Sequence, residues 1–429
     1  MTREFLFATF EGGGNVPPML GAVRRLVERG HHVRVLGDDS MQSDVAAVGG
    51  SFVPWRRAPN RPDRGVASDF LRDWEAEGEG GGLLRLLDGL TIGPAAAFAG
   101  DTVDELRRHA ADVLVSCDIL FGPMIAAEAT GTKLALFGSN ISVVVPLPGV
   151  PPVGPGLLPA VTEDDHAQAD GVRAWFADAL AARLPVLNAA RAAFGLAPLS
   201  DGFAQPAKAD QVLLATSRAF DFPAERLPPT LRYVGPLLEQ PHWAGTWASP
   251  WPADDTRKLV LIALSSTFQD QVPTIQSVLD ALAPLPVRAL VTLGPGLADA
   301  HLTLPGNAVA VAAAPHDVVM REAALVVTHC GHGTVMRALA HHKPMLCLPM
   351  GRDQNDNAAR VAARGAGLRL AHNADVDALR DAIGQLLRDP AFTAAASALG
   401  AAIAAAEPAS ALVDELEVLA SCQLRCAAA

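Results

Sequence analysis

A short run rich in histidine and glycine, residues 328–334, carries the residue types best suited to binding chemistry in this chain. Gly331 and Gly333 let the backbone turn sharply and let a ligand approach closely. Thr334 can cap a following helix, and the free N–H groups and positive dipole end of such a helix attract an anion. His329 can add a donor to the same anion. The run therefore suits a phosphate or a diphosphate.

The flanking segments predict that this run joins a strand to a helix. Residues 324–328 are apolar and β-branched, which is typical of a short buried strand. Residues 335–340 are rich in helix-forming side chains. Many glycine-rich turns between strand and helix bind nothing, so the turn alone leaves a binding and a purely structural interpretation open.

A second polar pair follows the next predicted strand. Residues 344–350 form an apolar segment bounded by prolines, and Asp353 and Gln354 lie just beyond its end. Ligands of open α/β sheets bind beyond the carboxyl ends of the strands. A carboxylate beside an amide suits sugar hydroxyls. The sequence thus predicts one site that places a diphosphate cradle beside a polyol-binding pair.

The run from residue 329 to residue 367 resembles the donor-binding motif of nucleotide-sugar glycosyltransferases. It is most similar to the bacterial natural-product, macrolide-type group of the UGT-like glycosyltransferase family 1. The residues that carry the resemblance are His329, Gly331, Gly333, Thr334, Pro344, Pro349, Asp353, Gln354, Asn357 and the Gly365–Gly367 turn. The resemblance implies an α/β chain with the GT-B fold, in which two Rossmann-like domains with parallel sheets face each other across a cleft.

The resemblance also implies further donor contacts. His332 lies within the cradle run, Ser266 matches the hydroxyl residue that touches the donor diphosphate, and His316 matches the position where relatives hold the nucleotide base. Many relatives place an aromatic residue just before that position. This chain has Ala313 and Ala314 there, so base stacking is not expected from these residues.

Four segments are expected along the chain. Residues 1–236 form an N-terminal acceptor-binding domain, and residues 258–408 form the donor-binding domain. Residues 237–257, rich in tryptophan and proline, form a linker. Residues 409–429 form a final helix that crosses back to the first domain, as the resemblance implies. The first domain opens with a strand–helix–strand unit over residues 4–37.

The opening unit has some features of a dinucleotide site. Three glycines, Gly12 to Gly14, follow the first strand, and Asp38 ends the second at a distance suited to a ribose. However, Pro17 stands where the dinucleotide fingerprint requires a third glycine. An NAD- or FAD-linked oxidoreductase is therefore disfavoured.

The implied reaction is metal-independent glycosyl transfer with inversion, in which the cradle stabilises the departing diphosphate. His329 and His332 have a spacing that could ligate zinc, but the glycine-rich turn between them and the resemblance argue against a metal site. No cofactor is expected beyond the co-substrate, a dTDP- or UDP-sugar. Arg337 occupies the spacing at which relatives that use UDP-glucose carry a ribose-binding glutamate, which favours a dTDP-deoxysugar because that donor lacks the 2′-hydroxyl.

The residues that act as the general base in relatives are not present at the matching positions of this chain. Relatives place a histidine after the first strand and orient it with an aspartate after a later strand. Here those positions hold Asn15 and Cys117, with Asp118 one residue later. Asn cannot act as a base at neutral pH. Four explanations stay open: Asp118 or Glu11 is the base, the acceptor is acidic enough to need little help, Asn15 positions the acceptor and proximity suffices, or the chain is a non-catalytic helper or regulatory protein that binds a nucleotide sugar.

The acceptor is expected to be a hydrophobic natural-product scaffold lodged near Gly13, Gly14, Asn15 and the Pro/Gly loop at residues 145–159. The sequence determines neither its identity nor the attacking atom.

Composition narrows the class of protein. The net charge of −12 disfavours a nucleic-acid partner. The five cysteines lack a disulfide framework, and no signal peptide or uniformly apolar membrane span is evident. A cytoplasmic protein that does not bind membranes is therefore expected. A homodimer is compatible with the sequence, which does not determine the oligomeric state.

Overall fold

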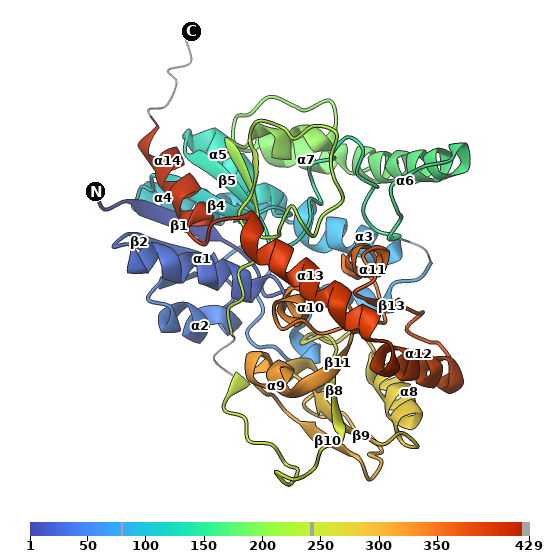
Figure 1. The fold of residues 1–429 in the computed structure, drawn as a ribbon. Coiled ribbons are helices and arrows are strands. Elements are labelled where there is room, and N and C mark those ends of the chain that lie inside the picture. Colours follow the sequence, from blue (N-terminus) through green and yellow to red (C-terminus); the bar gives the residue numbers. More distant parts are fainter. Residues whose placement is uncertain (79, 241–243, 423–429) are drawn as a thin grey trace.

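The computed structural model describes residues 1–78, 80–240 and 244–422 and contains two α/β units, each built on a fully parallel sheet (Figure 1). Trp243 of the expected linker and Cys426 lie outside the described residues, as does the end of the expected final helix. The sequence had predicted two parallel sheets, and this is confirmed.

The first sheet has seven strands in the order β3-β2-β1-β4-β5-β6-β7. Its central strands are continuous apolar runs because helices cover both faces of a parallel sheet. The strands are β1 (Glu4–Ala8), β2 (His32–Gly37), β3 (Ser51–Pro54), β4 (Val113–Cys117), β5 (Lys133–Gly138), β6 (Gln211–Leu214) and β7 (Leu231–Tyr233). The longer helices of this unit are α1 (Val16–Glu28), α4 (Ala95–Arg108), α5 (Phe121–Thr130), α6 (Glu163–Ala181) and α7 (Leu184–Ala192).

The second sheet has six strands in the order β10-β9-β8-β11-β12-β13. The strands are β8 (Lys258–Ala263), β9 (Val287–Thr292), β10 (Ala308–Val311), β11 (Ala323–Thr328), β12 (Met345–Cys347) and β13 (Gly367–Arg369). Its helices are α8 (Val272–Leu282), α9 (His316–Glu322), α10 (His332–Ala340), α11 (Gln354–Ala363), α12 (Val376–Arg388) and α13 (Pro390–Ala406). β8 and β11 lie at the centre, so the turns that follow them meet at one edge of the sheet.

The helices α6 and α7 are separated by a break at residues 182–183. Pro185 lies in the first turn of α7. A proline is tolerated there but cannot continue a helix from upstream, because it lacks an N–H and clashes with the preceding turn.

A buried ion pair joins the two units. Both Arg360 Nη2 and Asp221 Oδ1, 2.7 Å apart, are almost wholly buried, and the Tyr233 hydroxyl donates to the other carboxylate oxygen at 2.8 Å. Arg360 also stacks over the ring of Phe222. Because breaking a buried pair leaves an uncompensated charge, these contacts fix how the units meet.

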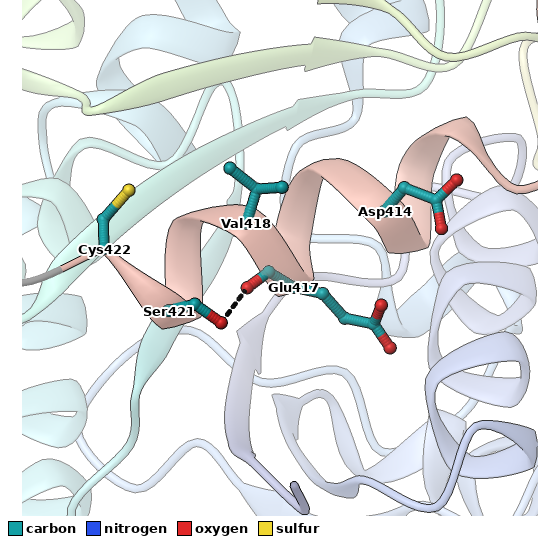
Figure 2. Close-up of a pocket in the computed structure, with 5 residues that line it drawn as sticks. All are labelled: Asp414, Glu417, Val418, Ser421 and Cys422. Carbon is teal, nitrogen blue, oxygen red and sulfur yellow. Dashed lines mark hydrogen bonds between the residues drawn. The ribbon is translucent and has the colours of Figure 1, made fainter.

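The last helix, α14 (Ala411–Ser421), packs on α1, β4 and β5 of the first unit (Figure 1). Leu412 and Leu416 are fully buried in the first unit's core. Figure 2 shows the outer face of α14, where Asp414 and Glu417 line a shallow hollow of about 460 Å³. Both carboxylates pair with groups at the end of α1, so this hollow marks an attachment of the helix.

Two helical stretches, Gly81–Arg108 and Pro390–Ser421, are long and apolar enough to cross a membrane by length and composition alone. Buried core helices pass the same test, so two such stretches are weak evidence for a membrane span. Both stretches are packed within the fold, since α4 lies against α5 and α13 lies against α10.

Candidate functional site

The turn between β11 and α10 contains the residues that were predicted to cradle an anion. Gly331 is the N-cap of α10, and its carbonyl accepts from the N–H of Thr334 at 3.0 Å. The N–H groups of His332 and Gly333, at the first two helical positions, have no partner within the helix. Thr334 was expected to cap the helix, and this was wrong. It is the third helical residue, because the helix begins two residues earlier.

The ring of His329 lies over this turn. A Cβ on Gly331 would lie only 2.6 Å from His329 Nε2, so only glycine fits beneath the ring. Burial, and then the nearby Arg352 guanidinium, lower the pKa of His329 to about 3, against a weaker opposing effect of the Ala263 carbonyl. The imidazole is therefore neutral at pH 7 and carries one N–H. Its Nδ1 has no partner at normal hydrogen-bond geometry among the described residues.

His332 takes part differently from what was expected. Its Nε2 lies 2.8 Å from the Thr216 hydroxyl of the first unit, and its ring meets Phe220 edge-on. Burial lowers the pKa of His332 to about 3. The side chain thus joins the two units, and only the backbone N–H of His332 faces the cradle. The same contact argues against a zinc site shared with His329.

Asn357 ties the two halves of the motif together. Its Nδ2 donates to the Cys330 carbonyl at 3.0 Å and to Asp353 Oδ2 at 2.8 Å. Cys330 has a positive φ of 68°, a strained backbone for a residue with a side chain. The Asn357 contacts therefore hold the cradle turn in a conformation that it would not favour alone.

Asp353 lies at the N-cap of α11 and Gln354 is its first residue, both beyond the end of β12, but they are not equally available. Gln354 is buried, where its Nε2 donates to Gln269 Oε1 at 3.0 Å and its Oε1 accepts from the Met350 N–H at 2.8 Å. Its amide is thus engaged in shaping the loop. Asp353 is half-buried, and burial raises the pKa of its carboxyl while the Asn357 amide opposes that shift. Asp353 is the better candidate for a sugar hydroxyl.

Ser266 lies where the turn after β8 meets the first unit. A Cβ on Gly13 would lie 3.0 Å from Ser266 Oγ and 2.7 Å from Thr267 Cγ2, and Gly13 has a φ of 76°. Glycine is therefore required there for both space and backbone conformation. This brings the turn after β1, with Gly13, Gly14 and Asn15, directly against the predicted diphosphate side.

His316 and Arg337 lie further along the same edge. His316 Nε2 is 3.1 Å from the Thr292 hydroxyl, and burial, then Arg337, lower the pKa of His316 to about 4. Arg337 is not a solvated helix residue. It is buried, pairs with Asp317 and donates to the Glu239 carbonyl at 2.8 Å. No carboxylate is presented from position 337.

The three candidate catalytic residues, Glu11, Asn15 and Asp118, differ sharply in their surroundings. Glu11 is buried, and both of its carboxylate oxygens accept hydrogen bonds. Arg64 Nε donates to its Oε2 at 2.7 Å, and the Gly13 N–H donates to its Oε1 at 2.9 Å. Asn15 donates its Nδ2 to the Phe10 carbonyl at 2.9 Å, and its buried Oδ1 has no partner among the described residues. Glu11 thus orders the glycine turn and is poorly placed to accept a proton.

Asp118 has the properties of a base. It follows β4, the neighbour of β1, and its buried Oδ2 has no hydrogen-bond partner in the part of the chain that the structure describes. Burial raises the pKa of Asp118 to about 7, well above its ordinary value, although nearby donors oppose the shift. Its Oδ2 would lie 3.0 Å from a Cβ on Gly138, so the carboxylate lies close to the end of β5.

The loop at residues 145–159 contacts the second unit. The N–H groups of Gly154 and Gly156 donate to the two carboxylate oxygens of Asp356 at 2.7 and 3.2 Å. Arg369 donates to the Gly156 carbonyl at 3.1 Å. Sequence reasoning missed Asp356, although its place three residues after Asp353 on the same helix was a usable signal. The expected acceptor-side loop therefore lies directly against the donor helix α11.

Two further observations concern other kinds of site. A hollow of about 520 Å³ lies between Pro349 and Asn373 at the edge of the second sheet, outside the cradle. Among residues 1–78, 80–240 and 244–422, no group of three or more His, Cys, Asp or Glu side chains could hold a metal ion.

Comparison with known proteins shows which families and proteins this chain resembles. Residues 276–419 match the family model of the erythromycin biosynthesis protein CIII-like C-terminal domain. The chain is 27% identical to 4'-demethylrebeccamycin synthase of Lentzea aerocolonigenes, over 98% of this chain and 100% of that protein. It is 24% identical to demethyllactenocin mycarosyltransferase of Streptomyces fradiae, over 84% and 74% of the two chains.

Solved structures share the whole fold. The glycotransferase of kitacinnamycin superposes with a TM-score of 0.75 at 20% identity, over 97% of this chain and 99% of that one. The glycosyltransferase VinC, solved in complex with dTDP, superposes with a TM-score of 0.68 at 19% identity, over 97% and 99%.

Two parallel sheets with their strand-end turns facing each other, together with these likenesses, define a glycosyltransferase with the GT-B fold. In sequence and fold the chain is similar to the bacterial natural-product group of glycosyltransferase family 1. It transfers a sugar to an aglycone.

Proposed function

We propose that this enzyme transfers a deoxysugar from a dTDP-activated donor to a hydrophobic natural-product scaffold, with inversion at the anomeric carbon and without a metal ion. The neutral ring of His329 above Gly331, beside the free N–H groups at the start of α10, is the observation that carries the proposal. These donors are aimed at one place before any charge develops there. Such preorganised donors stabilise a departing diphosphate more effectively than water can.

The choice of dTDP rests on position 337. Arg337 is engaged by Asp317 and the Glu239 carbonyl, so this position offers no acceptor for a ribose 2′-hydroxyl. A deoxyribose lacks that hydroxyl, so it loses no hydrogen bond when position 337 offers no acceptor. The structural neighbour VinC was solved with dTDP, which supports the same choice.

Asp118 is the proposed general base. A carboxyl group with a pKa near 7 is poised to take a proton at neutral pH, and its free oxygen is not held by another residue. Asn15, Gly13 and Gly14 form the floor of the acceptor side, and Asn15 positions the acceptor. The loop at residues 145–159 closes that side against α11.

The test is turnover of dTDP-activated deoxysugars with a panel of polyketide and aromatic aglycones, in buffer with and without EDTA. Equal product in EDTA, with an anomeric configuration opposite to that of the donor by NMR, is the expected result. Retained configuration or a requirement for added divalent metal would contradict the mechanism. Tight nucleotide binding with no turnover of any donor would favour the alternative, a helper protein that only binds the nucleotide sugar.

A further inference from the structure

Arg352 lies in the turn between β12 and α11, immediately before Asp353. Its backbone has a φ of 54°, in the left-handed region that a residue with a side chain adopts only when its surroundings hold it there. That backbone sends the side chain across the carboxyl edge of the sheet, away from its own helix. The resemblance to known transferases gave no role to this position.

The guanidinium of Arg352 bridges the two units. Its Nε and Nη2 donate to the two carboxylate oxygens of Asp73 at 2.6 and 2.9 Å. Its Nη1 donates to the Thr267 hydroxyl at 3.0 Å. Asp73 begins a short 3-10 helix of the first unit, Asp73–Glu75, and its neighbour Trp74 meets Phe268 edge-on with ring centroids 5.0 Å apart.

This position is beside the diphosphate cradle. Thr267 directly follows Ser266, and both lie against Gly13 at the closest approach of the two units. The positive charge of Arg352 acts with burial to lower the pKa of His329, which places the guanidinium within electrostatic range of the cradle ring. The carboxylates of Asp73, Asp69 and Asp353 are the acidic groups that face it.

We propose that Arg352 is a ligand of the donor diphosphate and that Asp73 competes with the diphosphate for the same guanidinium. The inference rests on the proposed function, since it takes a nucleoside diphosphate as the ligand. An arginine fork binds a carboxylate or a phosphate with the same paired geometry, so the exchange needs only a small movement of the side chain. The net charge of the chain is −12, and Arg352 supplies the positive charge beside the diphosphate that a neutral His329 cannot supply.

The exchange has a consequence for the acceptor side. When the diphosphate takes the guanidinium, the 3-10 helix at Asp73–Glu75 loses its paired hydrogen bonds to the second unit and keeps the contact of Trp74 with Phe268. Donor binding thus loosens a segment of the first unit that lies at the mouth of the cleft.

Calorimetric titration with dTDP and with thymidine tests the proposal on four proteins: wild type, Arg352→Gln, Arg352→Lys and Asp73→Asn. Arg352→Gln is expected to raise the Kd for dTDP about tenfold or more, because it loses charge-assisted hydrogen bonds, and to leave the Kd for thymidine within about twofold. Arg352→Lys keeps the charge without the fork and is expected to fall between wild type and Arg352→Gln. Asp73→Asn is expected to lower the Kd for dTDP.

A matched control is available in the first unit. Arg183 Nε and Nη2 pair with Asp88 at 2.6 and 2.7 Å, a fork of the same geometry away from the cradle. Arg183→Gln is expected to leave both Kd values unchanged.

Some results would overturn this inference and leave the proposed function standing. One is an Arg352→Gln enzyme that binds dTDP as tightly as wild type does, or whose binding of dTDP and of thymidine is weakened equally. Another is weaker dTDP binding by Asp73→Asn, which would make Asp73 a positioning partner rather than a competitor. A wild-type enzyme that binds neither dTDP nor UDP would overturn the proposed function as well.

Discussion

Replacing His329 with alanine is expected to lower kcat for sugar transfer about 100- to 1000-fold, the loss typical of removing one preorganised donor from a developing anion. The ring lies over Gly331 at the cradle turn, and its Nδ1 has no partner among the described residues. Among the described residues, the ring interacts only weakly with the Ala263 carbonyl, and no hydrogen bond at normal geometry is made by Nδ1. The fold should survive, which circular dichroism and thymidine binding would check.

His332 provides the matched control, three residues along the same turn. Its Nε2 bonds the Thr216 hydroxyl of the first unit, and only its backbone faces the cradle. His332→Ala should lower the melting temperature more than His329→Ala does, and it should lower kcat far less. Equal losses of kcat in the two variants would mean that the His329 ring has no special part in stabilising the leaving group.

Replacing Asp118 with asparagine is expected to lower kcat/KM about 100-fold or more at pH 8, because asparagine cannot accept the acceptor's proton. In the wild type, kcat/KM should rise with pH up to about 7 and then level off. The sign follows from the base being active only when ionised, and burial raises the pKa of Asp118 to about 7. A pH profile that is flat between 5 and 8, or an Asp118→Asn enzyme of normal activity, would instead favour the explanation in which proximity suffices.

The raised pKa of Asp118 also predicts an effect on stability. Activity should rise with pH, whereas the contribution of this carboxyl group to stability should fall. A carboxyl group with a pKa of about 7 in the fold, against an ordinary 3.8, stabilises the fold while protonated. That contribution is full below about pH 4 and is lost as the pH rises to about 7. Asp118→Asn should therefore unfold at a higher temperature than wild type at pH 8, with a gain of at most about 4 kcal/mol, since each pKa unit corresponds to about 1.4 kcal/mol.

Local patterns predicted the fold well. Continuous apolar runs such as β1 and β4 are typical of buried strands of a parallel sheet, and glycine, proline and polar residues mark the turns between them. The cradle turn was likewise visible because its function depends on neighbours in sequence: Gly331 must be small because His329, two residues earlier, lies above it.

Contacts between the two units were not visible in the sequence. His332 and Thr216 are 116 residues apart, and Arg352 and Asp73 are 279 residues apart. No periodicity or spacing relates such positions, because they depend on how two separately folded sheets meet. The same limit applies to Glu11, a candidate base in the sequence, because Arg64, which pairs with it, lies 53 residues later.

The most direct test of the central claim is a calorimetric titration of the wild-type enzyme with dTDP, UDP, GDP and NAD. The cradle at residues 328–334 and the engagement of Arg337 predict that dTDP binds most tightly, with UDP weaker. Tighter binding of UDP would contradict the preference for dTDP inferred from Arg337 and would favour glucose-type donors. Binding of NAD alone would contradict the assignment of this cleft to a nucleotide sugar.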